Sequence, residues 1–117
     1  MQPVVYGIPN CDQVRRSLAW FEQHRIPVAF HDYRKSGAPQ ALLREWIKRC
    51  EWETLVNRRG TTWRTLPDPE KARLVDAGSA IRLMAAHPSV IRRPVVDYNR
   101  RLLVGFDPAL FATTFLR

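Results

Sequence analysis

The chain has 117 residues, enough for one domain with a single modest core. Its apolar fraction of 45% and charged fraction of 26% are typical of a globular protein and exclude a disordered tail. The longest apolar stretches, such as 102–106, are too short to cross a bilayer, and no signal peptide is visible. We therefore expect a cytoplasmic protein with no membrane partner.

The formal net charge of +8 raises a polyanion as a partner. However, the basic residues are scattered in pairs rather than gathered in a block or a helix stripe. The pairs are Arg15-Arg16, Arg58-Arg59, Arg92-Arg93 and Arg100-Arg101. This scatter favours a small oxyanion held by several guanidinium groups, and nucleic acid is not the expected partner.

The first third of the chain predicts a strand, a helix, a strand and a helix. Residues 3–8 form a short apolar run, and Asn10 can cap a following helix, with Gln13 as an approximate capping box. Residues 26–33 predict a second strand, and a helix should run from 39 to about 49. The apolar face of the first helix consists of Val14, Leu18 and Phe21.

The middle of the chain changes character. Residues 57–62 are polar and without a sustained period, which predicts a loop. Asp68 should begin a helix that has Pro69 at its first position. Gly78-Ser79 should break that helix and cap another, which ends before Pro88.

The last third predicts two strands and a helix. Residues 95–97 and 102–104 suggest a hairpin that turns at 98–100. Asp107 begins a final helix, with Leu110, Phe111 and Phe115 expected to point inward. The predicted fold class is therefore α/β, with the order β-α-β, helices, β-β-α.

Cys11 stands where the first strand meets the first turn of a helix. Unpaired backbone N–H groups and the positive end of the helix dipole favour its thiolate, the nucleophilic form. Arg15 lies one turn on and can add positive charge or bind an anion, whereas Asp12 opposes it. Position alone leaves two interpretations equally open, a nucleophile or a small buried apolar residue.

The spacing of the thiols limits the chemistry. The position three residues after Cys11 is Val14, so there is no Cys-x-x-Cys pair. A resolving thiol would come from Cys50, from glutathione or from a partner protein. Cys50 lies on the apolar stripe of its helix and is interpreted as structural. The two cysteines form no disulfide framework, and neither they nor the histidines have metal-ligand spacing, so no metal site is expected.

The segment VIRRPVV, residues 90–96, provides a second indication. A proline directly before a strand, preceded by arginine, is typical of the cis-proline loop that faces the reactive cysteine in thioredoxin-like folds. Arg93 would then point at an anion bound on Cys11. The alternative is that Arg92 and Arg93 are a solvated pair at a strand edge.

Three segments together resemble the arsenate reductase-related family (ArsC/Spx/YffB-like), and its YffB-like branch most closely. They are YGIPNCDQVRRSLAWFEQHRIPVAFHDYR, NRRGTTWRTL and IRRPVVDYNRRLLVGFDPALF. The resemblance implies a thioredoxin-like fold with an inserted helical subdomain. Residues 1–117 would form one ArsC-like domain, with a core at about 1–35 and 88–117 and an insertion at about 36–87.

The resemblance also implies the site residues. Cys11 matches the nucleophile of the family, Arg15 the arginine four residues beyond it, and Arg93 and Pro94 the anion-binding cis-proline loop. Either Arg58 or Arg59 matches a further arginine of the middle section.

Two other comparisons with the family concern single positions. Arg100 or Arg101 could match an arginine of the final hairpin. Gly7 stands where the glutaredoxin-coupled arsenate reductases carry a histidine, a departure that predicts weak arsenate reduction.

The expected function is a thiol-dependent reductase that acts through Cys11 on arsenate-like oxyanions or glutathione mixed disulfides. The resemblance implies glutathione as co-substrate, glutaredoxin as a further partner, and no bound cofactor. The alternative is a non-enzymatic Spx-type regulator or adaptor that binds RNA polymerase or another protein. A third option is glutathione binding or conjugation without arsenate chemistry.

Overall fold

The computed structural model describes residues 2–116 and divides the chain into two compact units. The first unit is formed by residues up to 32 and from 93 onward, and the second by residues 33–92. The expected helical insertion, 36–87, falls within the second unit. Each unit is described by itself below.

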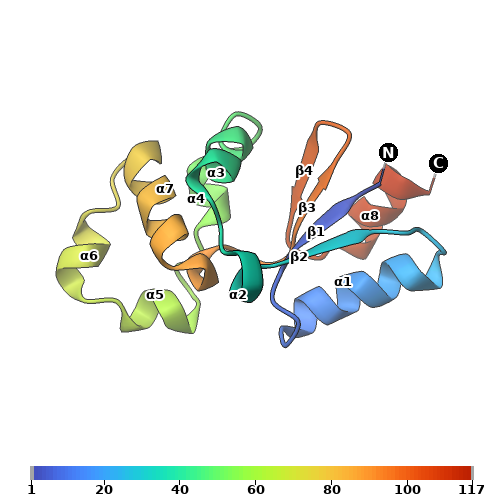
Figure 1. Ribbon diagram of the computed structural model, residues 1–117, viewed down its shortest axis with the longest axis horizontal. Helices are drawn as coiled ribbons and strands as arrows, with labels where there is room; N and C mark the ends of the chain where they lie inside the picture. Colours follow the sequence, from blue (N-terminus) through green and yellow to red (C-terminus); the bar gives the residue numbers. More distant parts are fainter. Residues whose placement is uncertain (1, 117) are drawn as a thin grey trace. The chain divides into compact units, whose positions relative to one another are not determined.

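A four-stranded sheet forms the centre of the first unit (Figure 1). Its strands are β1 (Val4–Gly7), β2 (Ala29–Asp32), β3 (Val95–Tyr98) and β4 (Arg101–Val104), in the order β2-β1-β3-β4. β1 pairs with β2 in parallel and with β3 antiparallel, and β3 pairs antiparallel with β4. The mixed α/β class predicted from the sequence is confirmed.

Two helices, α1 (Asp12–Gln23) and α8 (Pro108–Phe115), pack on one face of this sheet. Phe21 of α1 and Phe111 of α8 lie with ring centroids 5.3 Å apart. The buried cluster on this face consists of Val5, Phe21, Val96, Leu103 and Phe111. Burying side chains of this size contributes about 1.5–3 kcal/mol each, so this cluster is a main source of stability for the unit.

The β3–β4 hairpin turns through Asn99 and Arg100, as the sequence predicts. Both residues have positive φ, 48° for Asn99 and 69° for Arg100. Two successive left-handed residues define the type I′ turn, whose twist matches that of the flanking strands. Asn adopts this conformation readily, but Arg pays a steric cost for it.

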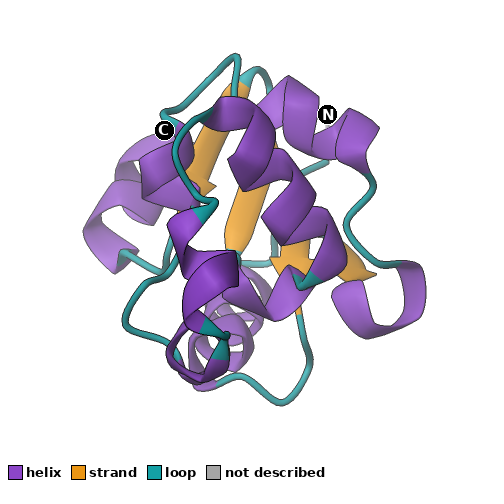
Figure 2. Cartoon of the chain, turned by 90° about the vertical axis from the view of Figure 1, so that its left-hand side faces the viewer, coloured by secondary structure: helices purple, strands orange, loops and turns teal. Residues whose placement is uncertain are grey.

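The second unit consists of helices and loops, whereas the four strands all belong to the first (Figure 2). Its helices are α2 (Tyr33–Ser36), α3 (Gln40–Trp46), α4 (Trp52–Leu55), α5 (Thr61–Thr65), α6 (Asp68–Ala72), α7 (Ala77–Ala86) and the 3₁₀ turn η1 (Pro88–Val90). Helix α3 packs against α7, which in turn packs against η1. An isolated bridge between Val56 and Ile91 joins the residue after α4 to the residue after η1.

Two of the predicted helix caps are wrong. The N-cap of α1 is Cys11 rather than Asn10, because Cys11 has extended backbone (φ −99°, ψ 128°) and its carbonyl accepts the first helical hydrogen bond. The N-cap of α7 is Asp76 rather than Gly78-Ser79. Asp76 accepts from the backbone N–H of Ser79, so Ser79 is the third residue of the helix and completes a capping box.

Other expectations differ from the structure in extent. The second strand is shorter than 26–33 and covers only Ala29–Asp32. The predicted loop at 57–62 ends early, because α5 begins at Thr61. Leu110 points outward and is 42% exposed, since Phe111 and Thr114 form the buried face of α8.

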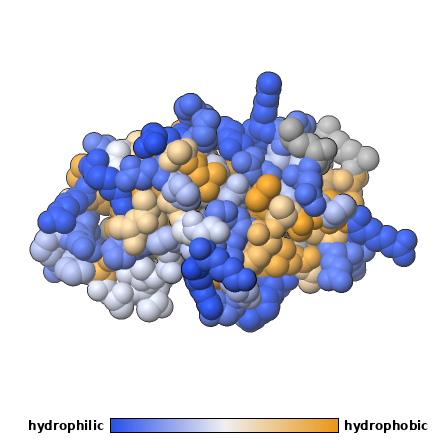
Figure 3. Space-filling view, in the orientation of Figure 1, coloured by the Kyte–Doolittle hydropathy of each residue, from blue (hydrophilic) through white to orange (hydrophobic). Residues whose placement is uncertain are grey.

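The surface of the face drawn in Figure 3 is mainly hydrophilic, and apolar atoms gather over the region where Figure 1 places β2. Phe30 of this edge strand is 37% exposed. Within residues 2–116, none of the helices has the length and hydropathy that a membrane span requires.

Candidate functional site

Cys11 lies at the carboxyl edge of β1, where the chain enters α1. Its N–H donates to the carbonyl of Ile8 (3.4 Å), and its own carbonyl accepts from the N–H of Arg15 (2.9 Å). The Cys11 side chain is half-buried and makes no capping hydrogen bond. The first-turn N–H groups are therefore not consumed by the cap, and the positive end of a twelve-residue helix faces the surroundings of the sulfur.

The Arg93–Pro94 peptide bond is cis, as the sequence predicts. β1 and β3 are antiparallel, and Tyr6 pairs with Val95. Pro94, the residue before Val95, therefore lies opposite Gly7 at the end of β1. The carbonyl of Pro94 accepts from the N–H of Gly105 (2.8 Å), which fixes this loop to the end of β4. Arg93 is half-buried. The sheet thus brings Cys11 and the Arg93–Pro94 loop to the same edge of the first unit.

Arg15 is exposed on the first turns of α1 and forms an ion pair with Asp12. The side chains of Arg15 and Asp12 are 57% and 77% exposed. Exposed pairs of this kind contribute about 0–1 kcal/mol, so a bound anion can displace the carboxylate. The positive charge expected beside the thiol is therefore shared with Asp12.

Gly7 is in close contact with the first helix. A Cβ placed on Gly7 would lie 2.6 Å from Cγ2 of Val14, a fully buried side chain. Any larger residue at position 7 therefore requires Val14 to move. The helix packs so closely on β1 that this position has no room for a histidine unless Val14 is also changed.

Arg58 and Arg59 lie in the second unit, between α4 and α5. The guanidinium of Arg58 lies 5.5 Å from the ring centroid of Trp63 and 6.0 Å from that of Trp52. Both distances fall within the range of cation–π attraction. Arg59 is exposed, and its backbone N–H donates to Oδ1 of Asn57 (3.1 Å). Sequence reasoning missed the pairing of Arg58 with the two tryptophans, although all three residues lie within a short segment.

Cys50 follows α3, and its Sγ donates to the carbonyl of Trp46 (3.6 Å). Burial raises the pKa of the Cys50 thiol, an effect that Arg49 opposes in part. This environment disfavours the thiolate and agrees with the structural interpretation of Cys50.

Arg100 and Arg101 do not lie with Cys11. The β3–β4 register places their turn at the opposite edge of the sheet, because β3 begins at the Pro94 edge and runs away from it. A four-residue strand spans about 13 Å. The strand register therefore separates both arginines from Cys11, and the pattern of adjacent arginines could not reveal the direction of the hairpin.

The sequence pattern of the ArsC family matches residues 6–114. The chain belongs to the ArsC family. It is 37% identical over 111 residues to an uncharacterized protein of Haemophilus influenzae, with 95% of this chain and 96% of that protein covered. It is also 26% identical over 106 residues to the global transcriptional regulator Spx of Bacillus subtilis, with 88% and 79% covered.

Solved structures give the same family. The YFFB protein superimposes with a TM-score of 0.91 and is 41% identical, with 96% of this chain and 97% of that protein covered. An arsenate reductase (ArsC) related protein of Brucella melitensis has a TM-score of 0.76 and is 43% identical, with 98% and 95% covered. The similarities confirm the ArsC/Spx/YffB-like assignment and the thioredoxin-like α/β fold. Membership in the ArsC family supports a thiol-dependent, reductase-like protein.

Proposed function

We propose that the protein is a glutathione-coupled thiol reductase in which Cys11 is the only catalytic thiol. The Cys11 thiolate attacks the glutathione sulfur of a mixed disulfide, forms a Cys11–glutathione disulfide and releases the substrate thiolate. A second glutathione thiolate then attacks this adduct, yields oxidised glutathione and regenerates Cys11. Glutaredoxin can replace the second glutathione as the reductant, and no resident metal or cofactor takes part.

The position of Cys11 is the observation that carries this proposal. A half-buried thiol at the N-cap of a long helix, at the edge that also holds a cis Arg93–Pro94 loop, is placed to act as a nucleophile on an extended ligand. Val14 occupies the position three residues after Cys11 where a Cys-x-x-Cys motif would have its second thiol. A mechanism with one cysteine and an external thiol therefore fits the sequence. Cys50 lies in the second unit, in a setting that disfavours its thiolate.

Arginine side chains supply the anion recognition that glutathione needs. In the proposal, Arg93 binds a carboxylate of glutathione in forked geometry, and Arg15 leaves Asp12 to support the thiolate. Arg58 or Arg59 binds a further carboxylate. Between these two, the guanidinium of Arg58 already packs against Trp52 and Trp63, which holds it in a defined position.

The contact between Gly7 and Val14 favours the mixed disulfide over arsenate as the better substrate. A cationic side chain at position 7 would help to stabilise the thiolate, but the packing leaves no room for one. We propose arsenate-like oxyanions as slower substrates: the Cys11 thiolate bonds to arsenic with loss of water, and a glutathione thiolate then attacks the Cys11 sulfur. This attack breaks the S–As bond, releases arsenite and leaves the Cys11–glutathione disulfide, which a second glutathione reduces as before.

Two cysteine variants test the mechanism. The assay follows release of thiol from a glutathionylated peptide in the presence of glutathione, with arsenate measured in parallel. Cys11→Ser should lower the rate by at least about 100-fold, a loss typical of removing a nucleophile. Cys50→Ser is the matched control and should retain most of the activity. Mass spectrometry should find the glutathione adduct on Cys11, and equal losses in the two variants would contradict a single-cysteine mechanism.

A regulator related to Spx is the second candidate, favoured by the 26% identity to Bacillus subtilis Spx over most of the chain. This candidate predicts binding to purified RNA polymerase that Cys11→Ser does not weaken, together with no turnover of the glutathionylated peptide. Turnover without polymerase binding supports the reductase.

A further inference from the structure

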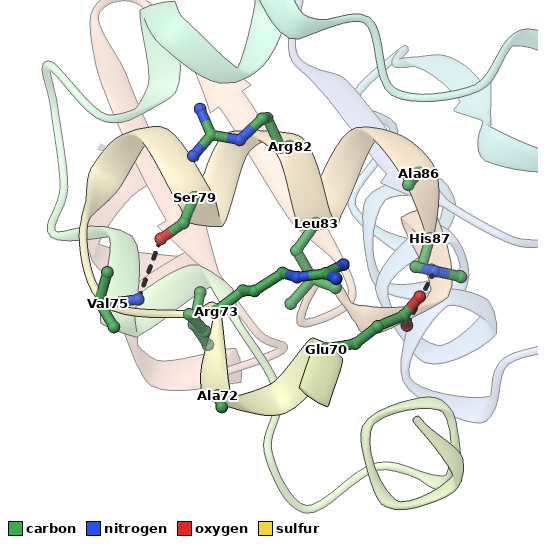
Figure 4. Close-up of a pocket in the computed structure, with 10 residues that line it drawn as sticks. Glu70, Ala72, Arg73, Val75, Ser79, Arg82, Leu83, Ala86 and His87 are labelled. Carbon is green, nitrogen blue, oxygen red and sulfur yellow. Dashed lines mark hydrogen bonds and ion pairs between the residues drawn. The ribbon is translucent and has the colours of Figure 1, made fainter. Parts of the chain in front are cut away.

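A pocket of about 410 Å³ lies within the second unit, between α6, α7 and the segment that joins them (Figure 4). Its volume is in the range of small-molecule sites. Most of its lining is apolar and comes from Ala72, Leu74, Val75, Leu83 and Ala86. None of the residues named for the Cys11 site contributes to it, so it is independent of the proposed reductase chemistry.

The turn into α7 holds one wall of the pocket in place. The Ser79 hydroxyl accepts from the N–H groups of Val75 and Asp76, both at 3.0 Å, and donates to the carbonyl of Asp76 at 2.9 Å. The Asp76 carboxylate closes the capping box on the N–H of Ser79. Because these bonds fix the backbone on both sides of Val75, the wall is formed before any ligand arrives.

Val75 is an apolar residue of the pocket lining whose side chain is largely exposed to solvent. Its side chain is 73% exposed, whereas the adjacent Leu74 is buried. A ligand with an apolar body would cover Val75 and Leu83 together and remove their surface from water.

The charges at the pocket are positive on balance. Arg73 and Arg82 both line it, and Figure 4 shows the Arg73 side chain extending across the pocket in front of Leu83. Oε2 of Glu70, the acidic residue of the lining, lies 3.7 Å from Nε2 of His87, and the two arginines outnumber this one carboxylate. Arg82 is attracted to Asp76, but within residues 2–116 no ion pair is described for Arg73. A guanidinium beside apolar walls therefore has an unused capacity for an anion.

We propose that this pocket binds a small amphipathic organic anion, such as an aromatic carboxylate. The apolar body lies against Val75 and Leu83, and the carboxylate accepts hydrogen bonds from Arg73, with Arg82 adding positive charge. A purely apolar molecule would leave the arginines unused, and a bare inorganic anion would leave Val75 uncovered.

Naphthalene-1-carboxylate is a suitable probe, with neutral 1-naphthalenemethanol as its matched control. Titration of the full-length ¹⁵N-labelled chain should give saturable chemical-shift changes confined to amides of residues 70–87. The carboxylate should bind about fivefold more tightly than the alcohol, the ratio expected of one partly exposed charge pair. Equal affinities, or shifts that centre on Cys11, would overturn the proposal.

Substitutions separate the two halves of the recognition. Arg73→Gln should reduce affinity for the carboxylate to that of the alcohol, and Arg64→Gln removes the same charge from α5 as the control. Val75→Asp should abolish binding of both probes, and the exposure of Val75 allows this variant to fold. Unchanged carboxylate binding in Arg73→Gln, or in Val75→Asp, would overturn the assignment.

Discussion

The contact between Gly7 and Val14 gives a direct test of how the site edge is built. In Gly7→Ala, the added methyl group would lie 2.6 Å from Cγ2 of Val14, whereas ordinary contacts of this kind fall at 3.4–4 Å. The strand or the helix must therefore separate by roughly 0.8 Å (3.4 − 2.6). Val14 is fully buried and has no solvent side to move into.

The expected magnitude follows from packing. Overpacking of a buried contact costs about 1–3 kcal/mol, and the lower backbone entropy of unfolded alanine returns about 0.4–1 kcal/mol. We expect Gly7→Ala to reduce the free energy of unfolding by about 1–2 kcal/mol. Val14→Ala removes the colliding methyl and costs roughly 1.6 kcal/mol in lost burial, plus a cavity term. In the Val14→Ala background, Gly7→Ala should be neutral or slightly stabilising.

A double-mutant cycle measures this coupling. Urea unfolding followed by circular dichroism gives the free energies of the four proteins, and a change of 1–2 kcal/mol shifts the midpoint by roughly 1 M. The same cost of Gly7→Ala in both backgrounds would refute the reasoning, because the collision would then not involve Val14. By the same reasoning, Gly7→His alone should be severely destabilised. The effect of a histidine at position 7 on arsenate reduction should therefore be measured in the Gly7→His, Val14→Ala double variant.

Three further changes test other parts of the structure. Arg100→Gly should raise the free energy of unfolding by about 1 kcal/mol, because Asn99-Gly is the preferred type I′ pair; a loss in urea unfolding would contradict the turn assignment. Hydrogen bonds from Ser79 lower the pKa of Asp76 in the folded protein. The ionised Asp76 carboxylate therefore adds its full share to the free energy of unfolding at pH values above the ordinary carboxyl pKa, and this share is lost as the pH falls through the lower pKa of the folded state. The destabilisation of Asp76→Ala should accordingly shrink on acidification, and a constant difference in urea midpoint from pH 6 to pH 2.5 would contradict this. Because burial raises the pKa of Cys50, iodoacetamide should modify it several-fold more slowly at pH 8 in the folded protein than in urea, measured in a variant that lacks the other thiol; equal rates would show that the thiol is not protected.

The elements that the sequence predicted well carry strong local signals. Asp107 caps α8 by accepting hydrogen bonds from the N–H groups of Ala109 and Leu110. The Asp107-Pro108 pair is a sequence pattern that predicts the beginning of a helix. The hairpin likewise follows from a short motif, whereas the cis Arg93–Pro94 bond is expected from the likeness of VIRRPVV to the loop of thioredoxin-like folds. Such features depend on residues that are adjacent in the chain, so they can be predicted without knowledge of the fold.

Other features could not be read in the same way. Helices α4 and α5 have about one turn each, too short to show a period, and exist because the unit packs around them. The distance of Arg100 from Cys11 depends on the direction of β3, which only strand pairing sets. The pocket beside Val75 is lined by α6, α7 and the segment that joins them, an arrangement that leaves no motif in the sequence.

The aromatic cluster under the sheet has an experimental consequence. Of the four tryptophans, Trp20 alone belongs to the first unit, where it lies edge-on to Phe21 and Phe111, and the other three belong to the second. Replacing those three with phenylalanine leaves a single fluorophore that reports on the thiol-bearing half, and replacing Trp20 leaves reporters for the other half. The chain thus carries its own optical labels for asking whether its two halves melt in one step or in two.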